Sequence, residues 1–269
     1  MSSNLEKLDL VPPDKVKGFF GSYYPPPELA SHFINNKLEE IYSVKRVHII
    51  VNPFAGKKNG NKIANLISQE LQELKIDSIT YTTEYANHAE KIVSDISFET
   101  GDSLMSVGGD GTISEIITGL LKRKDSSSDS VPLSIVPSGS GNSQANDMEV
   151  ADYLDAMQRM TVGNLRKMDV GKVTFMVDGK EQIRYSHNLV GWGLGVDANI
   201  LAEKMRFLGP IRYDLGSLMS IIRGKVRKAK CYIDGHLIDS SFILLLIQTT
   251  KTGGDRLTLA PMAHVDDGK

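Results

Sequence analysis

The stretch Ser103-Leu-Met-Ser-Val-Gly-Gly-Asp-Gly-Thr112 passes from apolar residues to glycines within a few positions. Its first half, 103–107, predicts a buried strand, and the periodic apolar residues of 112–121 predict a helix directly after it. Glycines between a strand and a helix let backbone N–H groups approach the oxygens of a phosphate. The stretch therefore predicts a ligand-binding turn in an α/β sheet.

Strands and helices alternate on both sides of this turn. We expect strands at 47–51, 76–82 and 133–136, and helices at 62–74, 88–96 and 153–160. Alternation at this spacing implies right-handed βαβ crossovers and a parallel sheet covered on both faces. Residues 45–165 are therefore predicted to form an α/β domain.

The pattern turns toward strands after about residue 165. We expect, in order, strands at 172–177 and 182–190, helices at 198–207 and 215–222, and strands at 229–233 and 237–247. Asp178-Gly179 and Asp234-Gly235 predict hairpin turns between paired strands. Residues 166–269 are thus predicted to form a β-rich, mostly antiparallel second domain. The proline-broken segment 1–44, with a helical pattern only at 28–42, is read as an accessory N-terminal segment.

The composition narrows the class of protein. The 269 residues carry 31 Lys+Arg against 33 Asp+Glu, so the chain lacks the basic field of a dedicated nucleic-acid binder. The longest wholly apolar run, 242–247, is far too short to span a bilayer, and the N-terminus has no apolar signal-peptide core. The single cysteine, Cys231, excludes an intramolecular disulfide and a cysteine-based zinc site. We expect a cytoplasmic protein.

Three glycine-bearing loops each follow a predicted strand. They are Asn52 to Gly60, Gly108 to Thr112, and Pro137 to Asn142. Because the carboxyl ends of parallel strands share one edge of a sheet, the three loops are expected to converge on one crevice. A Walker A loop does not fit, since Val51 and Lys58 stand where it needs a glycine and a Ser or Thr. One such loop alone would be read as a tight turn, but three together favour a phosphate site.

Asp110 lies among three glycines in the second loop. An exposed carboxylate with little packing around it suits two roles, holding Mg²⁺ or accepting a proton. Asp110 is therefore the candidate catalytic and metal-binding residue.

The order and spacing of the three loops resemble those of the diacylglycerol-kinase-type lipid kinases, from about Val44 to the end of the chain. The resemblance implies an N-terminal α/β nucleotide domain like that of 6-phosphofructokinase, followed by an antiparallel β-sandwich that receives the lipid. It also implies ATP and Mg²⁺ as cofactors and a lipid as substrate. NAD kinases share the Gly-Gly-Asp-Gly loop, so that loop alone leaves an NAD kinase open.

Two further segments resemble the sphingosine kinase and ceramide kinase branch. They are Thr83-Glu-Tyr-Ala-Asn-His-Ala89 and the stretch from Glu203 to Gly216. Carried over position by position, the resemblance implies that the nucleotide is bound by Asn52, Lys57, Thr83, Asn87, Gly108, Gly109, Gly111, Thr112, Glu115, Gly139, Ser140, Gly141, Arg206 and Arg212. Lys57 could equally be a solvated loop lysine.

The expected substrate residues are Asp197 and Asn199. Sphingosine kinases carry an Asp four residues before the equivalent of Glu203, where this chain has Asn199. Asp197 lies six residues before Glu203, a spacing more like that of ceramide kinase. The primary amine of a sphingoid base would use a carboxylate partner, whereas a ceramide would not. A sphingoid base is the first expectation, and ceramide and diacylglycerol stay open.

The remaining expectations concern the surface and the chain end. The basic cluster Arg223, Lys225, Arg227, Lys228 and Lys230 is read mainly as a solvated face, with docking to anionic lipid as the second reading. An enzyme of this kind would associate transiently with intracellular membranes. The chain stops just after the turn residues 266–268, which suggests a fragment, or a compact variant that closes its sheet as a homodimer. A catalytically inactive nucleotide- or lipid-binding module is the alternative outside enzymes.

Overall fold

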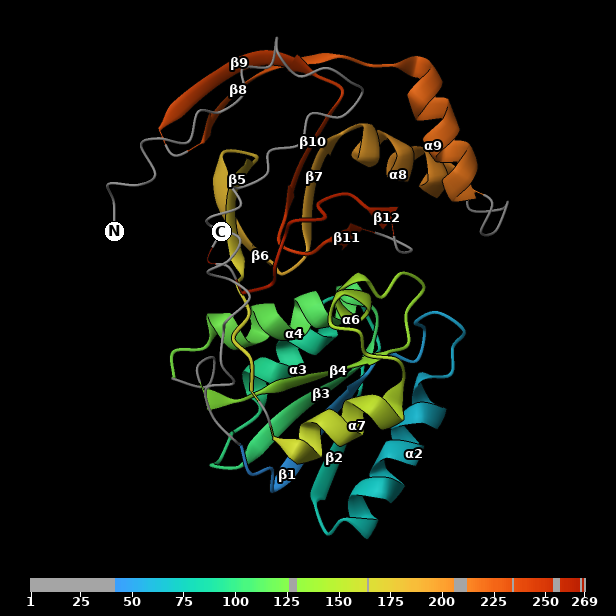
Figure 1. Cartoon of the computed structure of the whole chain (residues 1–269), viewed down its shortest axis with the longest axis vertical. Helices are drawn as coiled ribbons and strands as arrows, with labels where there is room; N and C mark the ends of the chain where they lie inside the picture. Colours follow the sequence, from blue (N-terminus) through green and yellow to red (C-terminus); the bar gives the residue numbers. More distant parts are fainter. Residues whose placement is uncertain are drawn as a thin grey trace. The chain divides into compact units, whose positions relative to one another are not determined.

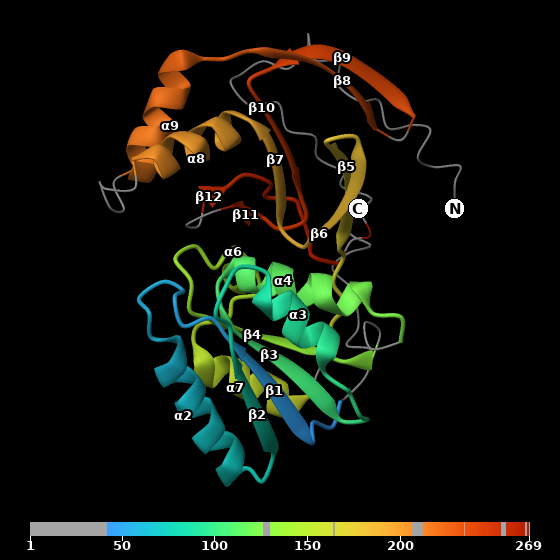
Figure 2. The same cartoon turned by 180° about the vertical axis from the view of Figure 1, so that it is seen from behind.

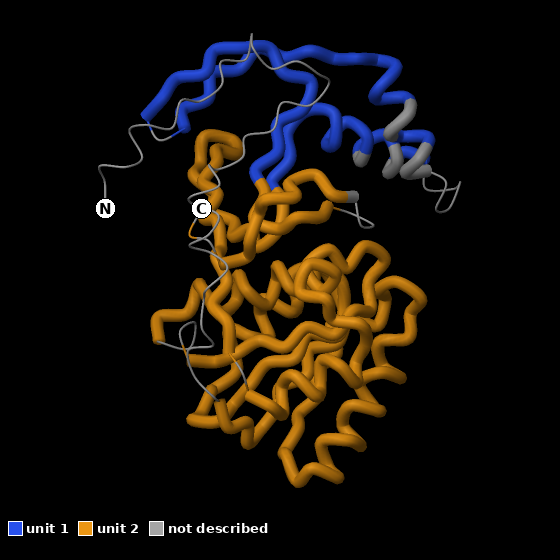
Figure 3. Tube along the Cα trace, in the orientation of Figure 1, with its two compact units in different colours: residues 1–26, 190–247 blue, residues 27–189, 248–269 orange. Residues whose placement is uncertain are grey.

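The computed structural model describes residues 42–269 except 126–129, 164, 206–211, 234, 254–256, 267 and 269. They divide into two compact units (Figure 3). The unit coloured orange in Figure 3, which we call the first unit, has its described residues within 27–189 and 248–269. The blue unit, which we call the second unit, has its described residues within 190–247. The helix expected at 28–42 lies outside the described residues, apart from its last position. The domain limits of 45–165 and 166–269 stay a prediction.

A four-stranded parallel sheet forms the centre of the first unit. Its strands are β1 (Arg46–Val51), β2 (Asp77–Thr82), β3 (Asp102–Gly108) and β4 (Leu133–Pro137). Their order is β2-β1-β3-β4, and every neighbouring pair is parallel (Figure 1). The predicted α/β class is thereby confirmed.

Helices cover both faces of this sheet. They are α2 (Gly60–Glu73), α3 (His88–Asp95), α4 (Asp110–Lys122) and α7 (Tyr153–Val162). The side chains of β1 alternate between the faces: Val47, Ile49 and Val51 pack in the core with α2 and α7, and Ile50 packs in the core with α3 and α4. Figure 2 shows the two helix layers on either side of the strands. From Val47 to Val51 the sequence of β1 is apolar except for His48. Such an apolar run is typical of a strand that is buried on both faces of a sheet.

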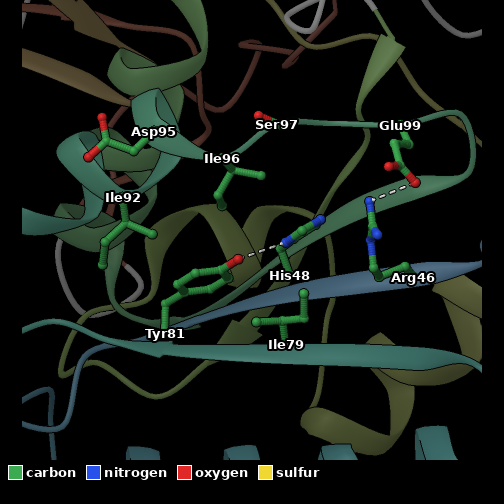
Figure 4. A pocket seen from close by; sticks show the side chains of 9 residues that line it. All are labelled: Arg46, His48, Ile79, Tyr81, Ile92, Asp95, Ile96, Ser97 and Glu99. Carbon is green, nitrogen blue, oxygen red and sulfur yellow. Dashed lines mark hydrogen bonds and ion pairs between the residues drawn. The ribbon is translucent and has the colours of Figure 1, made fainter.

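That histidine belongs to a buried polar network at the amino ends of the strands. Asp102 accepts hydrogen bonds from the Arg46 guanidinium at 2.9 and 2.7 Å, and its Oδ2 lies 3.1 Å from His48 Nε2. The Nδ1 of His48 lies 3.3 Å from the hydroxyl of Tyr81. Arg46, His48 and Tyr81 line a pocket of about 420 Å³ (Figure 4). The network starts at the first residues of β1 and β3, at the end of the sheet opposite the glycine loops, and reaches Tyr81 in β2.

The rest of the first unit consists of short elements. They are α6 (Ser143–Asp147), β5 (Gly171–Val177), β6 (Lys180–Ser186), β11 (Thr252–Gly253) and β12 (Leu257–Thr258). Strands β5 and β6 pair antiparallel around Asp178 and Gly179, whose φ values of 49° and 75° suit a tight hairpin turn. The hairpin predicted there is confirmed.

The described residues of the second unit form two helices and further strands, and β7 and β10 each share one residue with the first unit. In order they are β7 (Leu189–Gly193), α8 (Leu194–Lys204), α9 (Arg212–Arg223), β8 (Arg227–Ile233), β9 (His236–Phe242) and β10 (Leu244–Gln248). Strand β7 pairs with β10, and β8 pairs antiparallel with β9. Within the described ranges, none of the helices has both the length and the apolar character needed to cross a bilayer.

Two predicted strands are each interrupted in the structure. The strand expected at 182–190 breaks at His187 and Asn188, whose carbonyl groups accept hydrogen bonds from the side chain and backbone of Thr249. The strand expected at 237–247 breaks at Ile243, whose carbonyl accepts a hydrogen bond from the N–H of Leu194 at 2.9 Å. Both predictions of one continuous strand were wrong, because contacts with distant residues redirect the chain there.

Candidate active site

The three glycine loops meet at the carboxyl edge of the sheet. A β-carbon built on Gly56 would lie 2.5 Å from the carbonyl oxygen of Ser138, and one built on Gly139 would lie 2.5 Å from the Cα of Gly109. Gly56 also has a φ of +48°, which side-chain-bearing residues rarely adopt. The loops after β1, β3 and β4 therefore pack backbone against backbone, and glycine is required where they touch.

Polar side chains fasten these loops to one another. Asn52 donates from Nδ2 to Thr112 Oγ1 at 3.3 Å, which joins the first loop to α4. The hydroxyl of Ser138 donates to Asn59 Oδ1 at 3.3 Å, which joins the third loop to the first. Within the third loop, Asn142 Oδ1 accepts from the N–H of Gly139 at 2.8 Å. Since the loops are fixed by neighbouring loops as well as by their strands, their backbone N–H groups are held in place before any ligand arrives.

Asp110 is the first residue of α4, and its carboxylate accepts two backbone hydrogen bonds. Oδ2 accepts from the N–H of Ser143 and Oδ1 from the N–H of Gln144, both at 3.0 Å. A carboxylate oxygen has two lone pairs, so each retains one for a further partner. The side chain is thus oriented by two N–H groups and still able to bind a cation or accept a proton.

Helix α6, which supplies those two N–H groups, was missed by the sequence analysis. It is only five residues long and has no apolar stripe from which a helix could be recognised. The available signal was Asn142 followed by Ser143, residue types that commonly begin helices. Asn142 adopts a left-handed φ of 54° just before the helix, which turns the chain from the loop into α6.

Glu115 ties a fourth loop, the one after β2, to α4. Its Oε1 accepts from the N–H of Asn87 at 2.8 Å, and its Oε2 accepts from the N–H of Ala89 at 3.1 Å. Asn87 has a left-handed φ of 66° and precedes α3, while Thr83 is buried and bonds through its N–H to the carbonyl of Val51 at 2.8 Å. Glu115 therefore holds the start of α3 against the glycine loops.

The match to a known family coincides with this part of the fold. Residues 46–173, which contain the whole parallel sheet and all four loops, match the family model described as the diacylglycerol kinase catalytic domain. These residues are similar to the catalytic domain of the diacylglycerol kinase-type lipid kinases.

Named relatives of this family are similar to the chain over much of its length. Sphingosine kinase 1 of Arabidopsis thaliana is 31% identical over 185 residues, which cover 66% of this chain and 37% of the relative. Ceramide kinase of Homo sapiens is 28% identical, with coverage of 75% and 41%, and diacylglycerol kinase of Bacillus subtilis is 25% identical, with coverage of 84% and 72%. The chain spans about two fifths of the length of the two eukaryotic relatives.

A solved structure supports the same fold. The crystal structure of a diacylglycerol kinase from Bacillus anthracis str. Sterne matches with a TM-score of 0.64 at 24% identity, covering 83% of this chain and 71% of that chain. The α/β fold with a parallel sheet core and further antiparallel strands is therefore that of this lipid kinase family.

The structure places the other predicted nucleotide residues of the first unit on the same loops. Gly108 is buried at the end of β3, and Lys57, Gly111 and Ser140 are exposed. The carbonyl of Gly141 accepts a hydrogen bond from Asn146 Nδ2 at 3.1 Å. All of these residues belong to segments that begin where a parallel strand ends.

The predicted residues of the second unit lie on its two helices. Asp197 and Asn199 are in α8, Arg212 is the first residue of α9, and Arg206 lies outside the described residues. The carboxylate of Asp197 is bound by Arg227, with both oxygens 2.7 Å from Nη2. Arg227, read from the sequence as part of a solvated basic face, is thus an ion-pair partner of a candidate substrate residue.

Buried polar groups near Asp110 include two that the sequence analysis did not single out. Gln144 is fully buried, and neither atom of its side-chain amide has a partner among the described residues. The Nε2 of His187 is likewise buried without such a partner. Burial lowers the pKa of His187 to about 4, and the negative charge of Asp110 opposes part of that effect. At neutral pH His187 is therefore an uncharged imidazole, and the charge of Asp110 affects its pKa.

The residues present suit a magnesium–nucleotide complex. Among the described residues, no three His, Cys, Asp or Glu side chains gather into a metal-binding group. Mg²⁺ is often held by one or two carboxylates together with substrate phosphates and water, and Asp110 offers one such carboxylate. The close-packed glycines offer N–H groups to phosphate oxygens. The site therefore fits Mg²⁺ that arrives with ATP.

Proposed function

We propose that this chain is an ATP- and Mg²⁺-dependent lipid kinase that phosphorylates the primary hydroxyl of a sphingoid base. The observation that carries the proposal is Asp110, held by two N–H groups beside three interlocked glycine loops. The likeness to sphingosine kinases supports the choice of lipid. The similarity to a sphingosine kinase, a ceramide kinase and a diacylglycerol kinase favours a lipid rather than NAD as phosphate acceptor.

The roles of the residues follow from their chemistry. The lipid hydroxyl oxygen forms a bond to the γ-phosphorus of ATP, the bond from that phosphorus to the ADP oxygen breaks, and Asp110 accepts the hydroxyl proton. Asn52, Gly109, Gly139 and their loops hold the phosphates through N–H and side-chain donors. Mg²⁺ bound with ATP neutralises charge that develops on the phosphoryl oxygens. Glu115 keeps the loop after β2 in position.

Transient membrane association is part of the proposal, and the β8–β9 hairpin supports it. Lys228, Lys230 and Tyr232 alternate along β8 and are all exposed, as is Leu237, which pairs with Tyr232 across the hairpin. Exposed aromatic and aliphatic side chains beside lysines favour an anionic bilayer surface, each basic residue adding about 1 kcal/mol.

Ceramide is a second candidate substrate, and one observation favours it. The carboxylate of Asp197 is already paired with Arg227 at 2.7 Å. A carboxylate bound to a guanidinium is a poor partner for a second cation, and the amide nitrogen of a ceramide carries no charge. A sphingoid amine requires that this ion pair loosen, whereas a ceramide does not.

The test is phosphate transfer from γ-labelled ATP to a panel of sphingosine, ceramide, diacylglycerol and NAD, with Asp110→Asn as the matched variant. We expect labelled lipid from the wild-type chain and a loss of about 10²–10⁴-fold in Asp110→Asn, the usual range for losing general-base catalysis. Equal transfer by both proteins would refute the role of Asp110. Labelled NAD without labelled lipid would identify an NAD kinase, and thermal stabilisation by ATP without any transfer would identify an inactive binding module.

A further inference from the structure

Helix α6 contacts a distant part of the chain through its last residue, Asp147. Oδ1 of Asp147 accepts hydrogen bonds from the N–H of Thr252 at 3.1 Å and from its hydroxyl at 2.8 Å. Its Oδ2 accepts from the N–H of Lys251. These donors lie more than one hundred positions later in the sequence. Figures 1 and 2 both show β11, which Thr252 begins, beside α6.

The first residues of the same short helix orient the catalytic carboxylate. Ser143 and Gln144 donate their N–H groups to Asp110, and Asp147 lies only three positions after Gln144. A helix of five residues is too short to be stable alone. Its position, and with it the direction of the two N–H groups, therefore depends on what holds its ends.

The segment that Asp147 binds is itself anchored within the first unit. The N–H of Thr249 donates to the carbonyl of Asn188 at 2.9 Å, and its hydroxyl donates to the carbonyl of His187, also at 2.9 Å. The hydroxyl of Thr250 is bonded to Asn188 Oδ1. The chain leaves the first unit after Leu189 and returns at Gln248, so these bonds join the departing and returning segments. Asp147 connects these two hydrogen-bonded segments to α6.

We propose that Asp147 is a positioning residue for catalysis, which holds α6 against Lys251 and Thr252 and thereby keeps the N–H groups of Ser143 and Gln144 aligned with Asp110. The inference rests on the proposed kinase function and extends it to a residue that does not touch the substrate. Hydrogen bonds to an ionised acceptor are the stronger ones, and Asp147 accepts three of them. A displacement of a catalytic group by about 1 Å can cost on the order of 100-fold in rate.

The test compares Asp147→Ala with Asp152→Ala. Asp152 is the matched control because it also accepts two backbone N–H groups, those of Leu154 and Asp155, at the start of the neighbouring helix α7. Both variants lose a carboxylate that caps local structure, but only Asp147 is connected to the helix that orients Asp110. We expect Asp147→Ala to lower kcat at least 10-fold with a KM for ATP within about threefold of wild type. Asp152→Ala is expected to lower the melting temperature while its kcat stays within twofold.

Two further measurements separate positioning from general damage and from failure of the proposed function. Hydrogen exchange at the amides of Ser143 and Gln144 should accelerate in Asp147→Ala and stay unchanged in Asp152→Ala, whether or not the chain transfers phosphate. Asp147→Asn, which keeps an oxygen acceptor for Thr252, should recover much of the lost rate. Folded Asp147→Ala with wild-type kcat, or unchanged exchange at both amides, overturns the inference. A wild-type chain that transfers no phosphate refutes the proposed function. The hydrogen-exchange result then tests by itself whether Asp147 holds the amides of Ser143 and Gln144 in place.

Discussion

Gly139 packs on Gly109 so closely that a β-carbon on Gly139 would lie 2.5 Å from the Cα of Gly109. The two residues belong to loops that follow different strands, β4 and β3. A backbone-to-backbone contact of this kind cannot be relieved by turning a side chain. The close packing of these loops, which form the proposed nucleotide site, therefore depends on the absence of side chains at Gly109 and Gly139.

Gly139→Ala is expected to force the two loops apart. The added methyl group would meet backbone, so the strain must be relieved by moving a loop, and we expect a fall in melting temperature and weaker ATP binding. Gly111→Ala is the matched control for stability, because a β-carbon there meets nothing within 4 Å and the residue lies in α4. It should stabilise the fold slightly, by about 0.5–1 kcal/mol, the usual gain of Ala over Gly in a helix. Equal melting temperatures for the wild type and Gly139→Ala would contradict the close contact.

Glu115→Ala is expected to release the loop after β2. Two backbone N–H groups, those of Asn87 and Ala89, lose their acceptor, and hydrogen bonds to a charged group contribute about 1.5–3 kcal/mol each. Amide exchange at both residues should accelerate and the KM for ATP should rise. Glu73→Ala, at the exposed end of α2, removes a carboxylate away from these loops and should change neither quantity. Unchanged exchange at Asn87 would show that the loop is held by other contacts.

Acid should destabilise the amino end of the sheet through Asp102. Burial raises the pKa of Asp102, but hydrogen bonds from Arg46, from the N–H of Glu99 and from His48 outweigh burial, so its pKa lies below the usual range. A carboxyl group with a lowered pKa in the folded state stabilises the fold above its unfolded pKa of about 3.9, and this contribution is lost as the pH falls further. Chemical denaturation at pH 7 and pH 3 measures it.

Asp102→Asn isolates that contribution. The variant leaves Arg46 without its charge partner, so its free energy of unfolding at pH 7 should be lower than that of the wild type. Below pH 4 its stability should converge toward that of the wild type. A constant difference between the two proteins from pH 7 to pH 3 would count against a charged Asp102.

His187 should make the stability depend on pH in a separate, higher range. Its pKa of about 4 in the folded chain lies below the ordinary value of 6.5, because burial disfavours the charged imidazole. The unfolded chain therefore binds a proton that the folded chain does not between these pH values, and stability should fall by about 3 kcal/mol as the pH drops from 6.5 to 4. His187→Gln should flatten this part of the profile, and His236→Gln, at an exposed position, should not.

The parallel sheet and its helices could be predicted because their signals are local. The run from Val47 to Val51 and the stripe along α2 each repeat over enough residues to distinguish a strand from a helix, and the structure confirms both. The glycine loops could be assigned to one edge because a parallel sheet brings the carboxyl ends of its strands together. Repeated local patterns account for the parallel sheet and its helices, and one topological rule accounts for the position of the glycine loops.

The features missed from the sequence depend on contacts between distant residues. The break at His187 arises from Thr249, and α6 is short and held through Asp147 by Lys251 and Thr252. A periodic pattern within a window of 11–18 residues contains no information about hydrogen-bond partners that lie outside that window. The same reason explains why Asp110 was recognised as a candidate while the N–H groups that orient it were not.

The first unit is built from two separate segments of the chain, 27–189 and 248–269, and this affects how it forms during synthesis at the ribosome. The parallel sheet ends at Pro137, and its strands and helices have emerged long before the chain reaches Thr252. Until Lys251 and Thr252 have been synthesised, the carboxylate of Asp147 has none of its three donors. The last residue of α6 is then not held in place, although all the residues of the parallel sheet have already been made. The glycine loops of the proposed active site should thus assemble in two stages, the glycine contacts first and the orientation of Asp110 only after residues 190–247 have been made.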